Sequence, residues 1–210
     1  MTTILITGFG PFPGAPFNPT APLVHRLARL RRPALGGTKL IGHVFETSYA
    51  AVDRDLPRLI AAHRPDALLM FGVATRRKRL SIELRARNAL ALLPDASGRV
   101  LARRTIAADA PSALAIPMPR QALLAAARQA RVPTALSHDA GRYLCNYVCW
   151  RASAAMGERN GPRLAAFVHS PPLARTSRPT RNKRRPLTST DLARAGEAIL
   201  MALAAAARRP

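Results

Sequence analysis

The chain of 210 residues has only two cysteines, which are too few for a disulfide-rich fold. Aromatic residues make up 5% of the chain, and acidic residues number 11 against 33 Lys and Arg. No apolar run approaches the roughly 18 residues of a membrane-spanning helix, and the longest candidate is residues 67–74. The first residues carry no basic leader of the kind that precedes a signal peptide's apolar core. The sequence therefore predicts a cytoplasmic protein without a membrane segment.

The net charge of +22 has two interpretations. Taken alone, it suggests a polyanionic partner such as RNA or DNA. The arginines, however, are spread along predicted helices and loops and are not interleaved with aromatic residues. A compositional bias toward Ala, Pro and Arg is the second explanation of the charge. Any nucleic-acid binding is therefore expected to be non-specific.

The first part of the chain alternates between two patterns. Apolar runs predict strands at residues 3–8, 39–47 and 66–74, and the last of these is apolar enough for burial on both faces. Helical spacing of apolar residues predicts helices at 18–32, with Asn18 or Thr20 near its cap, and at 48–65. The alternation predicts βαβ units in an α/β sandwich with a largely parallel sheet.

The second part continues the alternation after a basic stretch. In that stretch Leu80, Ile82 and Leu84 alternate with polar or charged residues, which predicts a half-exposed strand over 79–85. The remaining expected elements are a loop at 92–100, helices at 119–131, 145–156 and 190–209, short strands at 132–138 and 163–169, and a basic Pro-rich loop at about 172–188. We expect one domain covering residues 1–210.

Cys145 and Cys149 lie four residues apart in one predicted helix. A disulfide is not expected, because cytosolic thiols stay reduced and side chains at this spacing are poorly aimed at each other. A metal site would need further Cys or His ligands close by, and the histidines are scattered. Cys145 begins the helix, where backbone N–H groups stabilise a thiolate. It is therefore a candidate nucleophile, although a small buried side chain is the alternative; Cys149 is assigned to the core.

His169 and Glu83 are candidate partners of that thiol. His169 ends a predicted central strand, at the edge of the sheet where α/β proteins build ligand sites, and it could exchange a proton with a cysteine; a structural role is the alternative. Glu83 stands among arginines, where it could form a surface ion pair or orient a histidine as the acid of a triad. The spacing of the residues leaves both alternatives open.

Four stretches resemble the pyroglutamyl peptidase I family of cysteine peptidases, in the family's order. They are "TGFGPFPG" followed by "NPT", "SYAAVDRDL" followed by "HRPDALLMFG", "DAGRYLCN", and "FVHSP". The resemblance spans nearly the whole chain, and "AG-x-Y-L-C-N" is its most specific part. It implies a phosphorylase/hydrolase-like α/β/α sandwich with a mixed, largely parallel sheet.

The same resemblance implies site roles. Cys145 would be the nucleophile, His169 the base and Glu83 the orienting acid. The substrate-binding residues that it implies are Phe9, Phe12, Val73, Tyr143 and Leu144. A phosphate loop is the rival interpretation of the glycine-rich turn, but Pro11 and Pro13 remove N–H groups that a phosphate would need.

The sequence departs from the family pattern mainly around the expected pocket. Residues 72–79 read "GVATRRKR" where the family has a Gly-Gln/Glu-Ala-Gly-Gly-Arg type of loop, so Val73 replaces a polar residue. The segment after Glu83 also differs and is about one residue shorter before Pro94. The triad is matched better than the specificity loop at residues 73–79.

The resulting prediction is a cysteine peptidase that cleaves after an amino-terminal pyroglutamyl or similar small acyl group, through a thioester and without a cofactor or metal. Its substrates would be peptides with an amino-terminal pyroglutamate or related small amides, and the resemblance implies a homo-oligomer. The alternative is a divergent relative with changed or lost activity that binds nucleic acid or an acidic partner through its basic surface.

Overall fold

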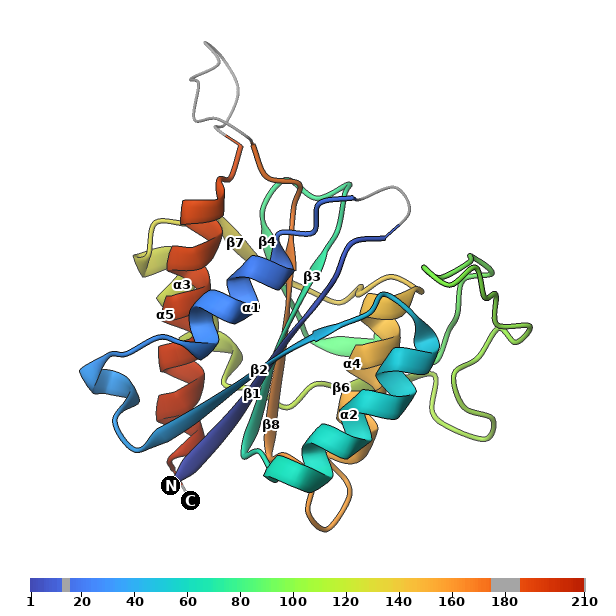
Figure 1. The fold of residues 1–210 in the computed structure, drawn as a ribbon, viewed down its shortest axis with the longest axis horizontal. Helices are drawn as coiled ribbons and strands as arrows, with labels where there is room; N and C mark the ends of the chain where they lie inside the picture. Colours follow the sequence, from blue (N-terminus) through green and yellow to red (C-terminus); the bar gives the residue numbers. More distant parts are fainter. Residues whose placement is uncertain (13–15, 175–185, 210) are drawn as a thin grey trace.

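Six strands form the central sheet of the computed structural model, which describes residues 1–12, 16–174 and 186–209 (Figure 1). In order across the sheet they are β2 (Thr38–Phe45), β1 (Thr2–Phe9), β3 (Ala67–Val73), β8 (Leu164–Ser170), β4 (Leu80–Glu83) and β7 (Thr134–Ser137). Neighbouring strands are parallel except β4 and β8, which are antiparallel. The predicted mixed, largely parallel sheet is confirmed.

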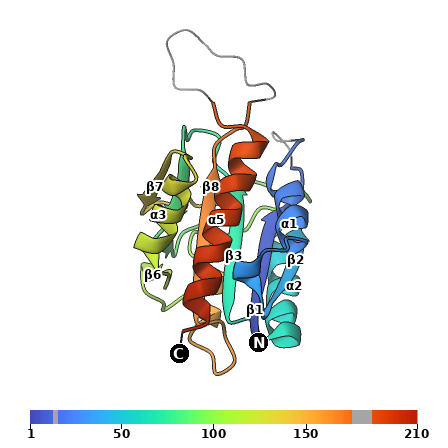
Figure 2. The ribbon, with the colours of Figure 1, turned by 90° about the vertical axis from the view of Figure 1, so that its left-hand side faces the viewer.

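Helices cover both faces of this sheet, as Figures 1 and 2 show. One face carries α1 (Thr20–Ala28), α3 (Arg120–Gln129) and α5 (Ser189–Ala207), and the other carries α2 (Tyr49–His63) and α4 (Leu144–Ala155). A 3₁₀ turn, Pro33–Leu35, precedes β2. No helix in the described ranges combines the length and apolar character needed to cross a membrane.

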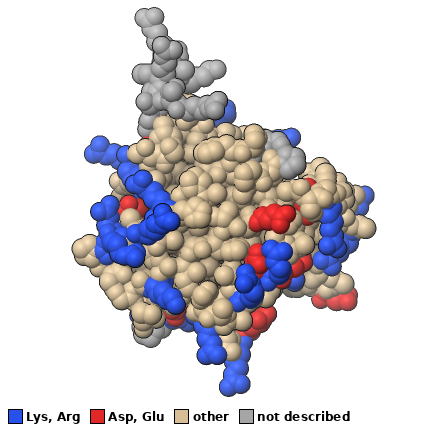
Figure 3. Space-filling view, viewed as in Figure 1, with Lys and Arg blue, Asp and Glu red and all other residues tan. Residues whose placement is uncertain are grey.

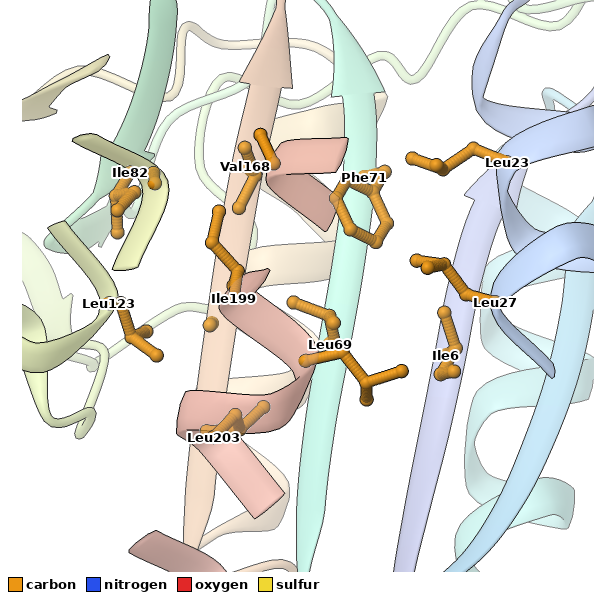
Figure 4. Close-up of a cluster of buried hydrophobic side chains, with 14 of the residues drawn as sticks. Ile6, Leu23, Leu27, Leu69, Phe71, Ile82, Leu123, Val168, Ile199 and Leu203 are labelled. Atoms are coloured by element: carbon orange, nitrogen blue, oxygen red, sulfur yellow. The ribbon is translucent and has the colours of Figure 1, made fainter. Parts of the chain in front are cut away.

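The core has two halves, one on each side of the sheet. Leu69 and Phe71 of β3 point to the side of α5, whereas Leu68 and Met70 point to the side of α2 and α4. All four are at most 1% exposed, because successive side chains of a strand alternate between faces that are both covered. Figure 4 shows the first half, with side chains from β1, β3, β4, β8, α1, α3 and α5 converging on one another. The unbroken apolar run predicted this double burial.

Local capping explains where two of the helices begin and end. The Ser48 side chain accepts a hydrogen bond from the Ala51 N–H at 3.2 Å and starts α2. The same helix ends at His63 and is capped by Arg64, whose φ of 42° is left-handed and which immediately precedes Pro65. A capping box between Thr188 and Asp191 starts α5. These caps fix the start and end of α2 and the start of α5.

The predicted half-exposed strand over 79–85 is wrong in two respects. Its residues in β4 are all buried, because β4 lies inside the sheet between β8 and β7. The strand also leaves this sheet at Leu84, and Arg85–Arg87 forms β5, which pairs antiparallel with an unpredicted strand, β6 (Ala113–Ala115). The alternating pattern was mistaken for one exposed face, although both faces of β4 are covered.

The outcome differs between the first helix and the basic Pro-rich loop. The first helix ends at Ala28, several residues before the predicted end at 32. The basic Pro-rich loop predicted at about 172–188 falls mainly on residues 175–185, which lie outside the described residues. The other predicted helices and main-sheet strands are present, with boundaries shifted by a few residues.

Candidate active site

His169 and Glu83 form a buried hydrogen-bonded pair. His169 of β8 is opposite Ser81 of β4, and Glu83 lies two residues further along β4, so both side chains project from the same face. His169 Nδ1 lies 2.7 Å from Glu83 Oε1. The side chains are 4% and 0% exposed, respectively. Glu83 is therefore not part of a surface ion pair, which was one of the two alternatives from the sequence.

Cys145 approaches the same histidine from the helix layer. It is the second residue of α4, as expected, and it is partly buried. Its Sγ packs against β3 at Gly72, where a Cβ atom would lie only 2.7 Å from the sulfur. Gly72 pairs in register with His169, whose side chain hydrogen-bonds Cys145. Because a carboxylate accepts the Nδ1 hydrogen, Nε2 is the nitrogen that faces the thiol.

The charges of this cluster favour a protonated histidine. Burial alone would lower the pKa of His169, but the charge and hydrogen bond of Cys145 and those of Glu83 outweigh burial and raise the pKa to about 9. The helix N-terminus adds backbone N–H groups that favour negative charge on the sulfur. The arrangement can therefore place an imidazolium beside Cys145, and a thiolate paired with an imidazolium is the reactive form of a cysteine nucleophile.

The second cysteine has a different environment. Cys149 is fully buried one turn further along α4, and desolvation raises the pKa of its thiol well above the usual range. Both cysteines are free, which confirms that they form no disulfide. In the described part of the chain no group of three or more His, Cys, Asp or Glu is placed to hold a metal ion.

The residues expected in the substrate pocket occupy different environments. Val73, partly exposed, directly follows Gly72, and Tyr143, also partly exposed, precedes α4 and donates a hydrogen bond to the Pro94 carbonyl at 2.8 Å. Phe9 is 3% exposed and packs against Phe45 with ring centroids 5.7 Å apart.

The other two expected pocket residues differ in exposure. Phe12 is partly exposed and adjoins residues outside the described ranges. Leu144 is 1% exposed and lies in the core half beside α2, so only its backbone could face a ligand.

Sequence reasoning missed residues that hold the site together. Asn146 is fully buried; its amide donates to the carbonyls of Arg87 and Ala89, and its Oδ1 accepts from the Arg87 N–H at 2.8 Å. It thus ties α4 to β5 directly after Cys145. A buried amide next to a candidate nucleophile could have been suspected, but its partners lie on a strand that the sequence pattern did not separate from β4.

The glycine-rich turn is also held by side chains. The carbonyl of Gly10 accepts hydrogen bonds from Asn18 at 3.0 Å and from Thr47 at 2.9 Å. Thr20 bonds the backbone of Phe9 and the side chain of Asn18. The "NPT" motif therefore fixes the end of β1 at Phe9 and the adjoining Gly10, and it lies at the start of α1.

The close approach at Gly72 predicts a sensitive position. In Gly72→Ala, the new methyl group would lie 2.7 Å from Cys145 Sγ and from Phe167, so the thiol, the Phe167 ring or both must shift, which disturbs the position of the thiol relative to His169. We expect alkylation of Cys145 by iodoacetamide at pH 7 to slow at least about tenfold, with a stability loss of about 1–3 kcal/mol from overpacking. Alkylation rates followed by mass spectrometry, together with thermal unfolding, measure both effects.

Gly157→Ala is the matched control, because the nearest atom to its new methyl group would be 3.5 Å away, an ordinary contact. Alkylation of Gly72→Ala at the parent rate would show that the thiol does not depend on this contact.

Comparison with known proteins places this geometry in a family. The sequence profile of the pyroglutamyl peptidase family matches residues 2–209. Pyrrolidone-carboxylate peptidases of Thermococcus onnurineus and Deinococcus radiodurans are 32% and 33% identical over 80% and 81% of this chain, and 82% and 78% of theirs. The solved structure of the pyrrolidone carboxyl peptidase from Thermococcus litoralis superposes with a TM-score of 0.85 at 26% identity, covering 97% of this chain and 93% of the other. The chain therefore belongs to the pyroglutamyl peptidase family of cysteine peptidases.

Proposed function

We propose that this enzyme hydrolyses the amide bond after an amino-terminal pyroglutamyl group, with Cys145 as nucleophile, His169 as general base and acid, and Glu83 as the orienting carboxylate. The observation that carries the proposal is the buried contact of 2.7 Å between His169 and Glu83, together with the hydrogen bond from the same histidine to Cys145. The relatives named pyrrolidone-carboxylate peptidases support the choice of substrate.

In the first half-reaction, the Cys145 thiolate attacks the carbonyl carbon of the pyroglutamyl group. The backbone N–H groups at the start of α4 would stabilise the oxyanion, because the first N–H groups of a helix have no partner within the helix. The imidazolium of His169 then gives its Nε2 proton to the leaving amine. The C–N bond breaks, a thioester forms on Cys145, and the shortened peptide leaves.

In the second half-reaction, neutral His169 takes a proton from a water molecule that attacks the thioester. The collapse of this intermediate releases pyroglutamate and restores the thiolate and the imidazolium. Throughout, Glu83 accepts the Nδ1 hydrogen and stabilises the charged ring without taking the proton. Over the whole cycle one water molecule is consumed, and the side chains return to their starting protonation states.

We further propose that Phe9, Phe12, Val73 and Tyr143 line the pocket for the acyl group, with the backbone of Leu144. Val73 supports this because it adjoins the strand residue on which the thiol packs. Its apolar side chain replaces a polar residue of the usual family loop, so recognition of the lactam would rely more on apolar contact.

We also propose that the chain is a single domain that assembles into a homo-oligomer. The exposed apolar side chains of Leu92, Leu93 and Val100, on the segment between β5 and β6, support an interface there.

The positive charge is distributed over the surface. In Figure 3, Lys and Arg side chains lie at several separate places on the visible face. Cytoplasmic location and non-specific nucleic-acid binding stay predictions from the sequence.

Cys145 should be the more reactive of the two thiols. One equivalent of iodoacetamide at neutral pH should label Cys145 well ahead of the buried Cys149 and abolish hydrolysis of a chromogenic pyroglutamyl amide. Cys145→Ser should be inactive, and Cys149→Ala, the matched control, should keep most of the activity. Hydrolysis by Cys145→Ser at the parent rate would remove Cys145 from the mechanism.

The value of kcat/KM should depend on the protonation of His169. Since the leaving amine needs the imidazolium, kcat/KM should fall as pH rises through the His169 pKa of about 9. Glu83→Gln removes a negative charge that stabilises the imidazolium, so this alkaline limb should move to lower pH, and the rate should drop about a hundredfold. Profiles of kcat/KM and of Cys145 alkylation measure both. A rate within about threefold of the parent, with an unmoved limb, would leave a Cys/His dyad.

Association of the protomers should depend on the salt concentration. Because each protomer carries +22, association should strengthen as salt screens the repulsion. Light scattering over a salt series should show a mass above 22.6 kDa that grows with salt, and Leu93→Asp should weaken association. A monomer at every salt concentration would contradict the proposal.

A further inference from the structure

Arg77 contacts the acid of the site directly. It lies in the loop between β3 and β4, and its guanidinium is 3.0 Å from Glu83 Oε1. This is the same oxygen that His169 Nδ1 approaches at 2.7 Å. The Arg77 side chain is 25% exposed, so it reaches from the surface to a carboxylate that is fully buried. Two cationic groups therefore converge on one oxygen.

The same guanidinium has a second partner on the way to the thiol. Arg77 donates a hydrogen bond to the carbonyl oxygen of Asp139, in the segment that leads from β7 to α4 and Cys145. Nearby, Arg85 Nε donates to the His138 carbonyl at 2.9 Å. Part of the basic stretch thus holds the segment that precedes the helix of Cys145.

The contact between Arg77 and Glu83 also affects the net charge of the buried cluster. A buried carboxylate without a cation is costly, and in the described part of the chain Glu83 Oε2 is buried without a hydrogen-bond partner. With a thiolate and an imidazolium formed, Arg77 brings the four groups to zero net charge. Without it the cluster carries one net negative charge in a poorly hydrated site.

We infer that Arg77 is a positioning residue: it fixes the Glu83 carboxylate and ties it to the segment that carries Cys145, so that acid, base and nucleophile keep one geometry. The inference rests on the proposed function, but it concerns a residue outside the triad. The other groups that interact electrostatically within this cluster are Tyr143, Cys145 and Cys149 beside or on α4, and His169 on β8.

Arg77→Met keeps much of the side-chain volume and removes the charge and both contacts. We expect kcat to fall about ten- to a hundredfold with KM within about twofold of the parent, because alignment and not binding is lost. Removing a positive charge makes each proton of the cluster harder to remove, so both limbs of the kcat/KM profile and the midpoint of Cys145 alkylation should move up by at least about half a pH unit.

Arg77→Lys keeps the charge but lacks the fork that bridges two acceptors, so it should restore the pH limbs and recover only part of kcat. Arg128→Met is the matched control. It removes an equal charge from an exposed position on α3, on the other side of the sheet from Cys145, and Arg128 has no ion pair within the described ranges. This variant should behave like the parent.

Each outcome decides between the alternatives. If Arg77→Met matches Arg128→Met in kcat and in both limbs of the pH profile, the inference is overturned. The kcat of Arg77→Met could also fall only in proportion to the amount of Cys145 that can still be titrated, while both limbs of the kcat/KM profile stay in place. That result shows a merely structural role for Arg77 and also overturns the inference. A parent enzyme that leaves the pyroglutamyl amide intact would contradict the proposed function instead, and the alkylation profiles would still test Arg77.

Discussion

The buried contact between Glu83 and His169 is the constraint on which the rest of the site depends. Neither side chain is more than 4% exposed, so their charges are not screened by water. A buried pair of this kind adds little to stability, because removing two charged groups from water costs about as much as their attraction returns. Its retention in a sheet core is therefore better explained by what the pair does to the neighbouring thiol.

The order and direction of the strands make this contact available. β4 is inserted between β8 and β7 and runs antiparallel to β8, which brings Glu83 to the level of Phe167 and within reach of His169. On the other side of β8, β3 presents Gly72 in register with His169. The missing side chain leaves a space that the sulfur of Cys145 fills from α4. Three neighbouring strands and one helix thus each supply one part of the site.

The sequence predicted the layers of the fold well, because the apolar run of β3, the helical spacing of apolar residues in α2 and the helix around Cys145 are local signals. The spacing of the residues could not show that Glu83 is buried, and only the family resemblance gave it a role. The alternation of Leu80 and Ile82 with polar residues is the same whether one face of a strand meets water or both faces are covered. Only the position of β4 between two other strands decides the matter, and this depends on contacts distant in sequence. The role of Gly72 is hidden for the same reason, since nothing near it in the sequence shows that a sulfur atom lies against it.

The basic stretch shows how composition alone can mislead. By charge, residues 76–87 suggest a solvated face or a site for a polyanion, yet three of their arginines contact the protein itself: Arg77 bonds Glu83 and Asp139, Arg85 bonds His138, and Arg87 lies 3.8 Å from Asp139. All three reach the same turn before α4, so their charge is partly used to fix the approach to Cys145. Of the residues in the loop after β3, Arg77 contacts both Glu83 and the turn before α4, so a change elsewhere in this loop can leave these two contacts in place.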